Sequence, residues 1–333
     1  ARERVLDALR AVANQSWRRL TGELAAFAQG RPRNAIRLTD FLTEQCLEST
    51  DLYSSTRSSS GWTALKRAAG LEAREAGPDE PYLGKRLSAL LDVNDGERVA
   101  LLRRIAMRDP LLWGSIDLRT LRQLQMLAYQ LYGQRSDLMD GDGFQARLDA
   151  SPLMREELGE LADWIDLRAD LELEPLPGVP QDWPLLLHGT YSRTEILSAT
   201  GFWSPQARPP MFEGLLNFKP LKLQLLFVTL DKKEGFHERI AYHDYAISPE
   251  LFHWQSQNNA GPDTASGRIY TQSATNGWRF QLFVRETPDH PFVALGPVTL
   301  DGEPTGAKPM SMVWKLERHV PMAMFRRFSV LRG

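Results

Sequence analysis

Several features that define common protein classes are scarce or missing in this sequence of 333 residues. A single cysteine, Cys46, excludes an internal disulfide and any thiolate-based zinc site. No window approaches the roughly eighteen consecutive apolar residues of a membrane-spanning helix. The P-loop pattern G-x-x-x-x-G-K-[ST] is missing as well, so any motor to which the chain belongs must lie elsewhere. These absences favour a cytoplasmic chain.

A strong excess of charge of one sign is also absent, because 40 Lys and Arg side chains oppose 42 Asp and Glu side chains. This near balance argues against a generic nucleic-acid-binding chain. The distribution is uneven: residues 1–180 hold 24 basic and 28 acidic side chains, whereas residues 181–333 hold 16 and 14. All six histidines lie in the second part, the first of them being His188. The two parts are therefore expected to differ in chemistry.

Residues 1–170 are predicted to form a set of helices. The chain begins at Ala1 with an amphipathic helical pattern instead of a signal peptide, and a start without Met suggests a fragment or a processed chain. Further periodic runs are separated by Gly-, Pro- and Ser-rich breakers, and Asp95 and Ser151 are predicted to start helices. These runs lie at 36–45, 61–71, 83–93, 96–106, 118–133 and 154–173.

Beyond a proline-rich segment the period of the apolar residues changes to two. Short runs rich in β-branched and aromatic residues occur at 223–230, 278–286, 292–300 and 311–317, and each is bounded by turn-forming residues. A short helix is expected over 192–200. We therefore predict an α+β chain with a helical connector at 1–175, a proline-rich linker at 176–183 and a β-rich domain at 184–333. The domain would be a twisted antiparallel sheet or a small barrel.

Side chains suited to binding gather between residues 231 and 286. The stretch LFHWQSQNN at 251–259 carries many hydrogen-bonding groups and, after its first two residues, no apolar repeat. It is interpreted as a binding loop, because side chains with several donors are costly to order without a partner. Cations would contact phosphates, aromatic rings would stack on bases, and amides would read base edges. The candidates are Lys232, Lys233, Arg239, Tyr242, His253, Trp254, Gln255, Ser256, Gln257, Asn258, Arg268 and Tyr270, and Arg279 adds charge nearby. The alternative is a hydrophilic loop whose aromatic residues simply pack on the sheet.

Two other kinds of site are considered for the histidines. The segment HGTYSRTEILSATGF at 188–202 resembles the NAD-binding strand of ADP-ribosyltransferases, which would make His188 and Tyr191 cofactor ligands. His237, His243 and His253 are a second possibility, as metal ligands, although their spacing lacks a supporting carboxylate.

The order of motifs in the second part resembles a bacterial family of domains of unknown function. It is carried by HGTYSRTEIL, the long stretch from LLFVTLDKKEG to QSQNN, SGRIYTQ, FQLFVRE and PMSMVWKLE. Such domains are found at the C-terminus of superfamily II helicases that often carry a phospholipase-D-type nuclease domain. The family pattern H-x-x-Y-[ST]-R-x-E implies a role for Tyr191 and Arg193, closed by Glu195, and the helical part resembles the extension between motor and terminal domain.

The resemblance and the polar cluster together predict a DNA-binding, substrate-recognition module of a helicase in a defence or DNA-processing system. The module itself would be non-catalytic and need no cofactor, since ATP and Mg²⁺ would belong to the absent motor. Its partners would be DNA, modified or single-stranded, and the helicase or nuclease part of the parent chain, without a membrane. A protein–protein adaptor and an NAD-dependent transferase are the alternatives.

Overall fold

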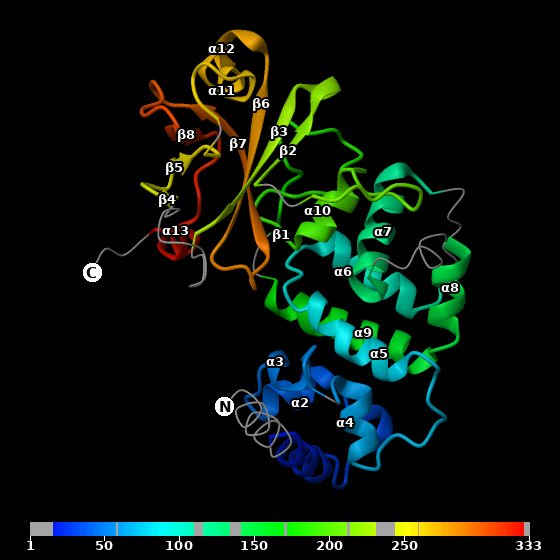
Figure 1. Cartoon of the computed structure of the whole chain (residues 1–333). Helices are drawn as coiled ribbons and strands as arrows, with labels where there is room; N and C mark the ends of the chain where they lie inside the picture. Colours follow the sequence, from blue (N-terminus) through cyan, green and yellow to red (C-terminus); the bar gives the residue numbers. More distant parts are fainter. Residues whose placement is uncertain are drawn as a thin grey trace, which may run out of the picture. The chain divides into compact units, whose positions relative to one another are not determined.

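The computed structural model describes residues 16–57, 59–109, 116–133, 141–169, 172–211, 214–230, 244–258 and 260–329, and the chain forms two compact units (Figure 1). Unit 1 comprises Ala1–Glu172 and Leu197–Ala207, and unit 2 comprises Leu173–Ile196 and Arg208–Gly333. The predicted α+β class is confirmed, because the helices of unit 1 precede a sheet in unit 2. Within the described residues, no helix is long and apolar enough to cross a membrane.

Unit 1 is helical. Residues 16–27 form its first described helix, and most of the predicted periodic runs coincide with later ones. The helices are α2 (Leu38–Glu44), α3 (Ser49–Leu52), α4 (Trp62–Ala68), α5 (Glu80–Arg86), α6 (Gly96–Ala106), α7 (Leu118–Tyr132), α8 (Gly141–Asp149) and α9 (Pro152–Arg168), with 3₁₀ turns η1 (Arg33–Ala35) and η2 (Leu87–Leu90).

Local signals explain where these helices begin. The Asp95 carboxylate accepts a hydrogen bond from the Arg98 amide at the start of α6, which confirms the predicted start. Proline at the first position of α9 follows Ser151, as predicted. The longest of these helices, α9, packs against α6 and α2, and its buried face includes Leu158 and Leu161. Burial of such apolar side chains is the main source of stability for a helical unit.

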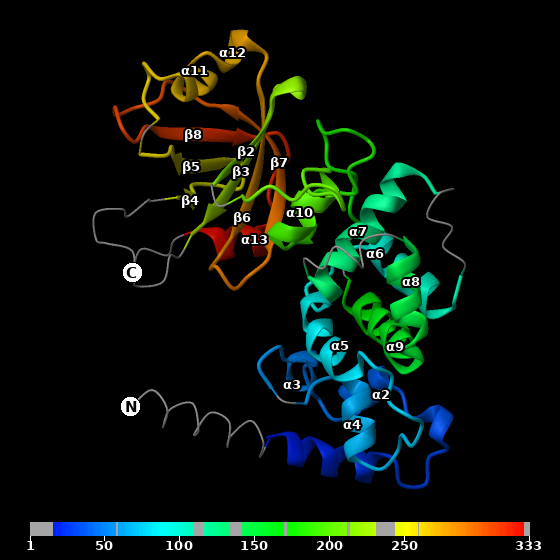
Figure 2. The same cartoon turned by 45° about the vertical axis from the view of Figure 1, so that its right-hand side comes forward.

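The elements of unit 2 form one mixed sheet of eight strands with helices beside it (Figures 1 and 2). Its strands are β1 (Thr190–Tyr191), β2 (Leu215–Phe218), β3 (Leu223–Thr229), β4 (Tyr245–Ala246), β5 (Leu251–Gln255), β6 (Arg279–Arg285), β7 (Phe292–Leu300) and β8 (Ser311–Leu316). The helices are α10 (Arg193–Ala199), of which residues 193–196 belong to this unit, α11 (Ala265–Thr271), α12 (Ser273–Asn276) and α13 (Met322–Phe328), with the 3₁₀ turn η4 (Lys219–Leu221).

The sheet differs from the predicted antiparallel sheet or barrel in two ways. Strands β3 and β6 pair in parallel, with Leu223 opposite Arg279 and Thr229 opposite Arg285, whereas the other pairs are antiparallel. The strand order β2-β3-β6-β7-β8-β5-β4 leaves β2 and β4 at the two edges, so within the described residues the sheet does not close into a barrel. A long connection containing β5 and two helices separates β3 from β6, as parallel pairing requires.

Alternating residues of the central strands face opposite sides of this sheet. Even-numbered residues of β6, including Leu282 and Val284, join one buried cluster with Trp254, Tyr270 and Trp314. Odd-numbered residues of β6, including Phe283, lie on the other face, where Phe283 stacks on Phe227 of β3. The proline-rich segment lies on this second face, since the Gln281 and Arg279 side chains donate hydrogen bonds to the carbonyl oxygens of residues 177 and 178.

Candidate nucleic-acid interface

The two aromatic rings proposed as base-stacking faces lie in the core of unit 2. Trp254 is 5% exposed and Tyr270 is 1% exposed. Their rings meet edge to face at 5.5 Å, and both pack against Trp314 at 6.2 Å. The reason is that residues 251–255 form strand β5 instead of a loop, with Phe252 and Trp254 facing inward. Stacking on a base needs an open ring face, so these two rings are assigned to the core.

The polar residues around Trp254 are mostly matched within unit 2. The Ser256 hydroxyl is fully buried, donates to the carbonyl oxygen of Ala260 at 3.1 Å and accepts from the Met310 amide at 2.9 Å. Gln255 donates from its amide to Asp244 and from its side chain to Ser311. The half-buried His253 ring stacks on Tyr245 at 5.1 Å. Beyond the end of the strand, Gln257 is half-buried and Asn258 is exposed.

Four predicted contact residues cannot be placed. Lys232, Lys233, Arg239 and Tyr242 lie at 231–243, outside the described residues, and so do His237 and His243 of the considered metal site. Among the residues that the structure does describe, no group of three or more His, Cys, Asp or Glu side chains is placed to hold a metal ion.

The HGTYSR segment has a clear structural role. The hydroxyl of buried Tyr191 accepts a hydrogen bond of 2.9 Å from the Leu186 amide, and a Cβ on Gly189 would lie 2.5 Å from that hydroxyl. Ser192 and Glu195 form a reciprocal capping pair at the start of α10, because each side chain accepts from the other's amide. His188 adopts a left-handed conformation at φ 63°, and burial lowers its pKa. The tyrosine and glutamate of the family pattern thus support the turn into α10.

Arg193 differs from these neighbours because its guanidinium lies over aromatic rings. Its central carbon is 5.2 Å from the Phe227 ring centroid and 5.6 Å from that of Phe292. Arg193 Nη1 also contacts Met211 Sδ at 3.2 Å. Burial lowers the pKa of Arg193, although arginine remains charged at any physiological pH. A second cation, Arg285, approaches Phe292 at 4.4 Å.

Four cations gather at one end of the sheet, and we call Lys219, Lys222, Arg268 and Arg279 the basic edge. Lys219 and Lys222 belong to the β2–β3 connection, Arg268 to α11 and Arg279 to the first position of β6. Both views place α11, α12 and this connection at the same end of the sheet (Figures 1 and 2). Within the described part of the chain, none of the four side chains forms an ion pair with a carboxylate; Arg279 instead donates to the carbonyl oxygens of Gly178 and Leu221.

Asn276, at the end of α12, joins the segments of the basic edge. Its side-chain amide donates to the carbonyl oxygens of Arg268 and Ile269, at 3.2 and 3.0 Å. Its side-chain oxygen accepts from the Trp278 amide at 2.8 Å, immediately before β6. Lys222 Nζ donates to its backbone carbonyl at 2.9 Å. The distant β2–β3 connection, α11 and the start of β6 are therefore held around one asparagine, with the half-buried Trp278 ring beside them.

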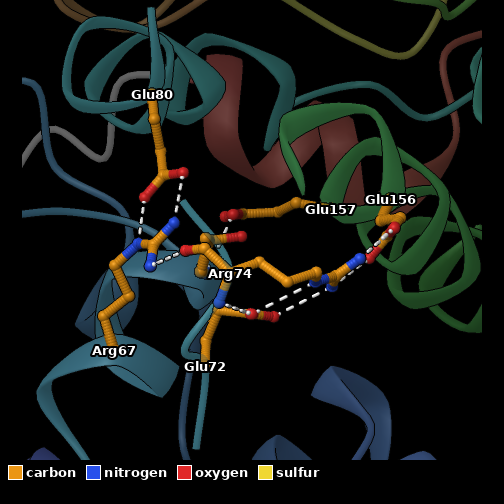
Figure 3. A network of polar contacts seen from close by, with 7 residues as sticks. Arg67, Glu72, Arg74, Glu80, Glu156 and Glu157 are labelled. Carbon is orange, nitrogen blue, oxygen red and sulfur yellow. Dashed lines mark hydrogen bonds and ion pairs between the residues drawn. The ribbon is translucent and has the colours of Figure 1, made fainter. Parts of the chain in front are cut away.

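Unit 1 has a groove of about 780 Å³ with a mixed-charge rim. Its floor is apolar and includes Ile36, Leu71 and Ala106, and its rim holds five basic and four acidic side chains, namely Arg33, Arg37, Lys66, Arg74 and Arg103 with Glu72, Glu156, Glu160 and Asp163. Arg74 is clamped between Glu72 and Glu156, at 2.9 and 2.7 Å (Figure 3). The positive charges of the rim are therefore largely compensated by the carboxylates of the same rim.

Comparison with known proteins identifies one family. Residues 185–328 match the family described as Domain of unknown function (DUF3427), and the match covers less than half of the chain. The predicted resemblance of the second part to a domain of unknown function is thereby confirmed. A search of curated proteins found no match.

Sequence reasoning missed two of the four residues of the basic edge. It named Arg268 and Arg279 for their charge, but not Lys219 or Lys222, because these two flank a proline in a short connection that carries no recognisable motif. It also missed Arg285, which ends a strand 92 positions after Arg193. The two arginines share the Phe292 ring of β7, a strand that pairs with both β1 and β6. A cue for Arg285 was present in FQLFVRE, where a strand otherwise apolar ends in a charge.

Proposed function

We propose that unit 2 is a DNA-binding module, and the basic edge is the observation that carries this proposal. These four cations have no carboxylate partner among the described residues, so their charge is available to bind a polyanion. Phosphate contacts by Lys and Arg supply most of the affinity of sequence-independent binding. Trp278, half-buried between α12 and β6, adds an aromatic surface of the kind on which bases stack.

The parent protein in this proposal is a bacterial superfamily II helicase in a defence or DNA-processing system. The resemblance of the second part and the match to the domain of unknown function support that assignment. Unit 1 would connect the module to the motor, which would hold ATP and Mg²⁺. Unit 2 itself would act by binding alone, and its substrate would be single-stranded, duplex or modified DNA.

Fluorescence anisotropy of the full chain with these three forms of DNA tests the proposal. Lys219→Gln together with Arg268→Gln should weaken binding, and should lower the slope of log affinity against log salt by about 1.8 for duplex DNA, or 0.9 per lost contact. Neither side chain makes a hydrogen bond or ion pair with another described residue, so the melting temperature should stay constant. Lys308→Gln with Arg326→Gln removes the same charge from exposed positions elsewhere in unit 2 and is the matched control. Failure of the wild-type chain to bind any form at low salt would refute the proposal.

A protein–protein adaptor is the second candidate, and the groove of unit 1 is the observation that favours it. An apolar floor with a rim of paired charges suits a peptide better than a polyanion, since polyanions need unbalanced positive charge. Met107, which lines the groove and is 77% exposed, offers a hydrophobic contact at its edge. Met107→Glu should then abolish binding to a motor or nuclease partner and leave DNA affinity unchanged. The NAD-dependent alternative rests on His188 alone, and NAD titration of the His188→Ala variant against the wild type would test it.

A further inference from the structure

Unit 2 has a further pair of cations, Arg193 and Arg285, at the end of β6 opposite the basic edge. Arg193 and Arg285 both lie against the ring of Phe292, with their central guanidinium carbons 5.6 and 4.4 Å from its centroid. These two distances limit the separation of the two carbons to 10.0 Å at most. Phe227 meets Phe292 edge to face at 5.3 Å, so the two arginines rest on a rigid, buried aromatic base.

Arg285 is held in place but keeps donors available. Its Nε donates to the Thr229 hydroxyl and its Nη1 donates to the Pro288 carbonyl oxygen, both at 2.9 Å. Within the described residues Arg285 forms no ion pair with a carboxylate. The adjacent Glu286 is engaged by Arg327 at 3.0 Å, and the charge of Asp289 acts to raise the pKa of Arg285. Nη2 of Arg285 makes no hydrogen bond with another described residue, so it remains able to donate to a ligand.

The two arginines repel each other in a partly dehydrated place. Burial and the charge of Arg193 both lower the pKa of Arg285, the burial effect being the larger. Like charges held together near apolar rings are a cost in free energy that a bound anion would offset. Guanidinium pairs suit phosphate in particular, because their planar donors match its oxygens two at a time.

We propose that Arg193 and Arg285 bind one phosphate group of a nucleic acid strand. The basic edge would hold the same strand at the other end of β6. This step rests on the proposed DNA-binding function. Arg279 and Arg285 are the first and last residues of the seven-residue strand β6 and face the same side, so at about 3.3 Å per residue they lie roughly 20 Å apart. Since each base pair advances B-DNA by about 3.4 Å, the ligand must span about six base pairs to reach both sites.

The length of the bound DNA therefore provides the test. Affinity of the full chain, measured by anisotropy with oligonucleotides of about 4 to about 12 nucleotides or base pairs, should rise steeply once both sites are reached. Arg285→Gln should weaken binding of the longest DNA about tenfold or more and leave the shortest unchanged, which flattens the length dependence. Arg285→Lys keeps the charge but loses the paired donors. Its affinity for the longest DNA should lie between those of the wild type and Arg285→Gln. Arg326→Gln on α13 is the control and should behave like the wild type.

The outcomes separate this inference from the proposed function. If Arg193→Gln and Arg285→Gln both bind every length like the wild type, while the basic-edge variant loses affinity, the phosphate site is refuted and DNA binding stands. If the wild-type chain binds no DNA, the proposed function fails, and inorganic pyrophosphate then tests the site directly. A rise in melting temperature with pyrophosphate in the wild type but not in Arg285→Gln supports the pair as a phosphate site, and the absence of any rise refutes it.

Discussion

Lys222 Nζ donates a hydrogen bond of 2.9 Å to the backbone carbonyl of Asn276, 54 residues later in the chain. The lysine has a left-handed conformation at φ 46°, so its backbone already turns sharply between η4 and β3. Its charge is thereby anchored beside Arg279, whose amide donates to the Lys222 carbonyl at 2.8 Å. The parallel pairing of β3 with β6 brings these cations together, although their separate positions in the sequence suggest no such site.

Asn276→Ala should destabilise unit 2 by about 1–2 kcal/mol and weaken DNA binding several-fold. It removes two donated hydrogen bonds to α11 and leaves the partly buried Trp278 amide without its acceptor. The Arg268 backbone would lose one contact, and the carbonyl at position 276 that Lys222 contacts would be less firmly held. Urea denaturation and anisotropy measure the two effects. Gln272→Ala, which truncates an exposed side chain in the same region, should change stability by less than about 0.5 kcal/mol.

Trp254→Ala should lower the stability of unit 2 by about 3–5 kcal/mol, the range for a large buried aromatic residue. Trp254→Phe should be much milder because it keeps a ring against Tyr270 and Trp314. Neither variant should alter the DNA affinity of chains that remain folded, as judged by anisotropy below the melting temperature. Loss of affinity at full stability would instead make Trp254 a base-stacking residue.

The contrast between Trp254 and the strand around it explains how far sequence reasoning reached. The strands β3, β6, β7 and β8 were predictable because they carry near-continuous or alternating apolar residues. Strand β5 was not predicted. Its outward positions are the polar His253 and Gln255, and the next inward position after Trp254 is the polar Ser256, so the apolar alternation is too short to recognise. Residue type alone suggests that Trp254 could stack on a base, and only the packing of neighbouring strands reveals that it does not face solvent.

The start of α6 at Asp95 was predictable for a different reason, and the pair of Ser192 with Glu195 at α10 is of the same kind. A cap is a contact between residues three or four apart, so the sequence contains both partners. The basic edge and the Arg193–Arg285 pair are contacts between distant segments, and no local rule fixes which strands become neighbours. Tyr191 was singled out by a motif, but its hydroxyl supports the Leu186 amide, a role that the motif does not distinguish from binding.

Glu157→Gln should change how the stability of unit 1 depends on pH. This fully buried carboxyl accepts the Trp62 and Thr63 amides at 2.6 and 2.9 Å, and burial raises its pKa above the ordinary 4.5. A raised folded-state pKa means that the folded chain binds the proton more tightly than the unfolded chain. The resulting stability is fully present below about pH 4.5 and is lost as pH rises through the folded-state pKa.

The glutamine variant lacks this titration, so the difference in unfolding free energy between wild type and variant should shrink as pH rises from below 4.5. Urea denaturation across a pH series measures it. Glu75→Gln, at an exposed position of the same unit, is the control for the loss of one carboxylate. A wild-type minus variant difference that grows with pH would contradict the argument.

Arg74→Gln should change the pH dependence of the stability of unit 1 in the opposite sense to Glu157→Gln. Hydrogen bonding to Arg74 lowers the pKa of Glu72 to about 2, and Arg74 also lowers the pKa of Glu156 (Figure 3). Depressed folded-state pKa values contribute stability above the unfolded value of about 4.5, and that contribution is lost as pH falls toward about 2. Because Arg74 is 55% exposed, solvent screens the network, and removal of Arg74 should reduce stability at neutral pH by only about 1 kcal/mol.

The wild type should therefore lose its advantage in stability over Arg74→Gln on acidification, as followed by thermal denaturation between about pH 7 and about pH 2. Arg104→Gln breaks a comparably exposed pair with Asp109 elsewhere in unit 1 and is the control for the loss of an arginine from a surface ion pair. Parallel curves for wild type and Arg74→Gln would mean that the clamp on Glu72 does not hold in solution.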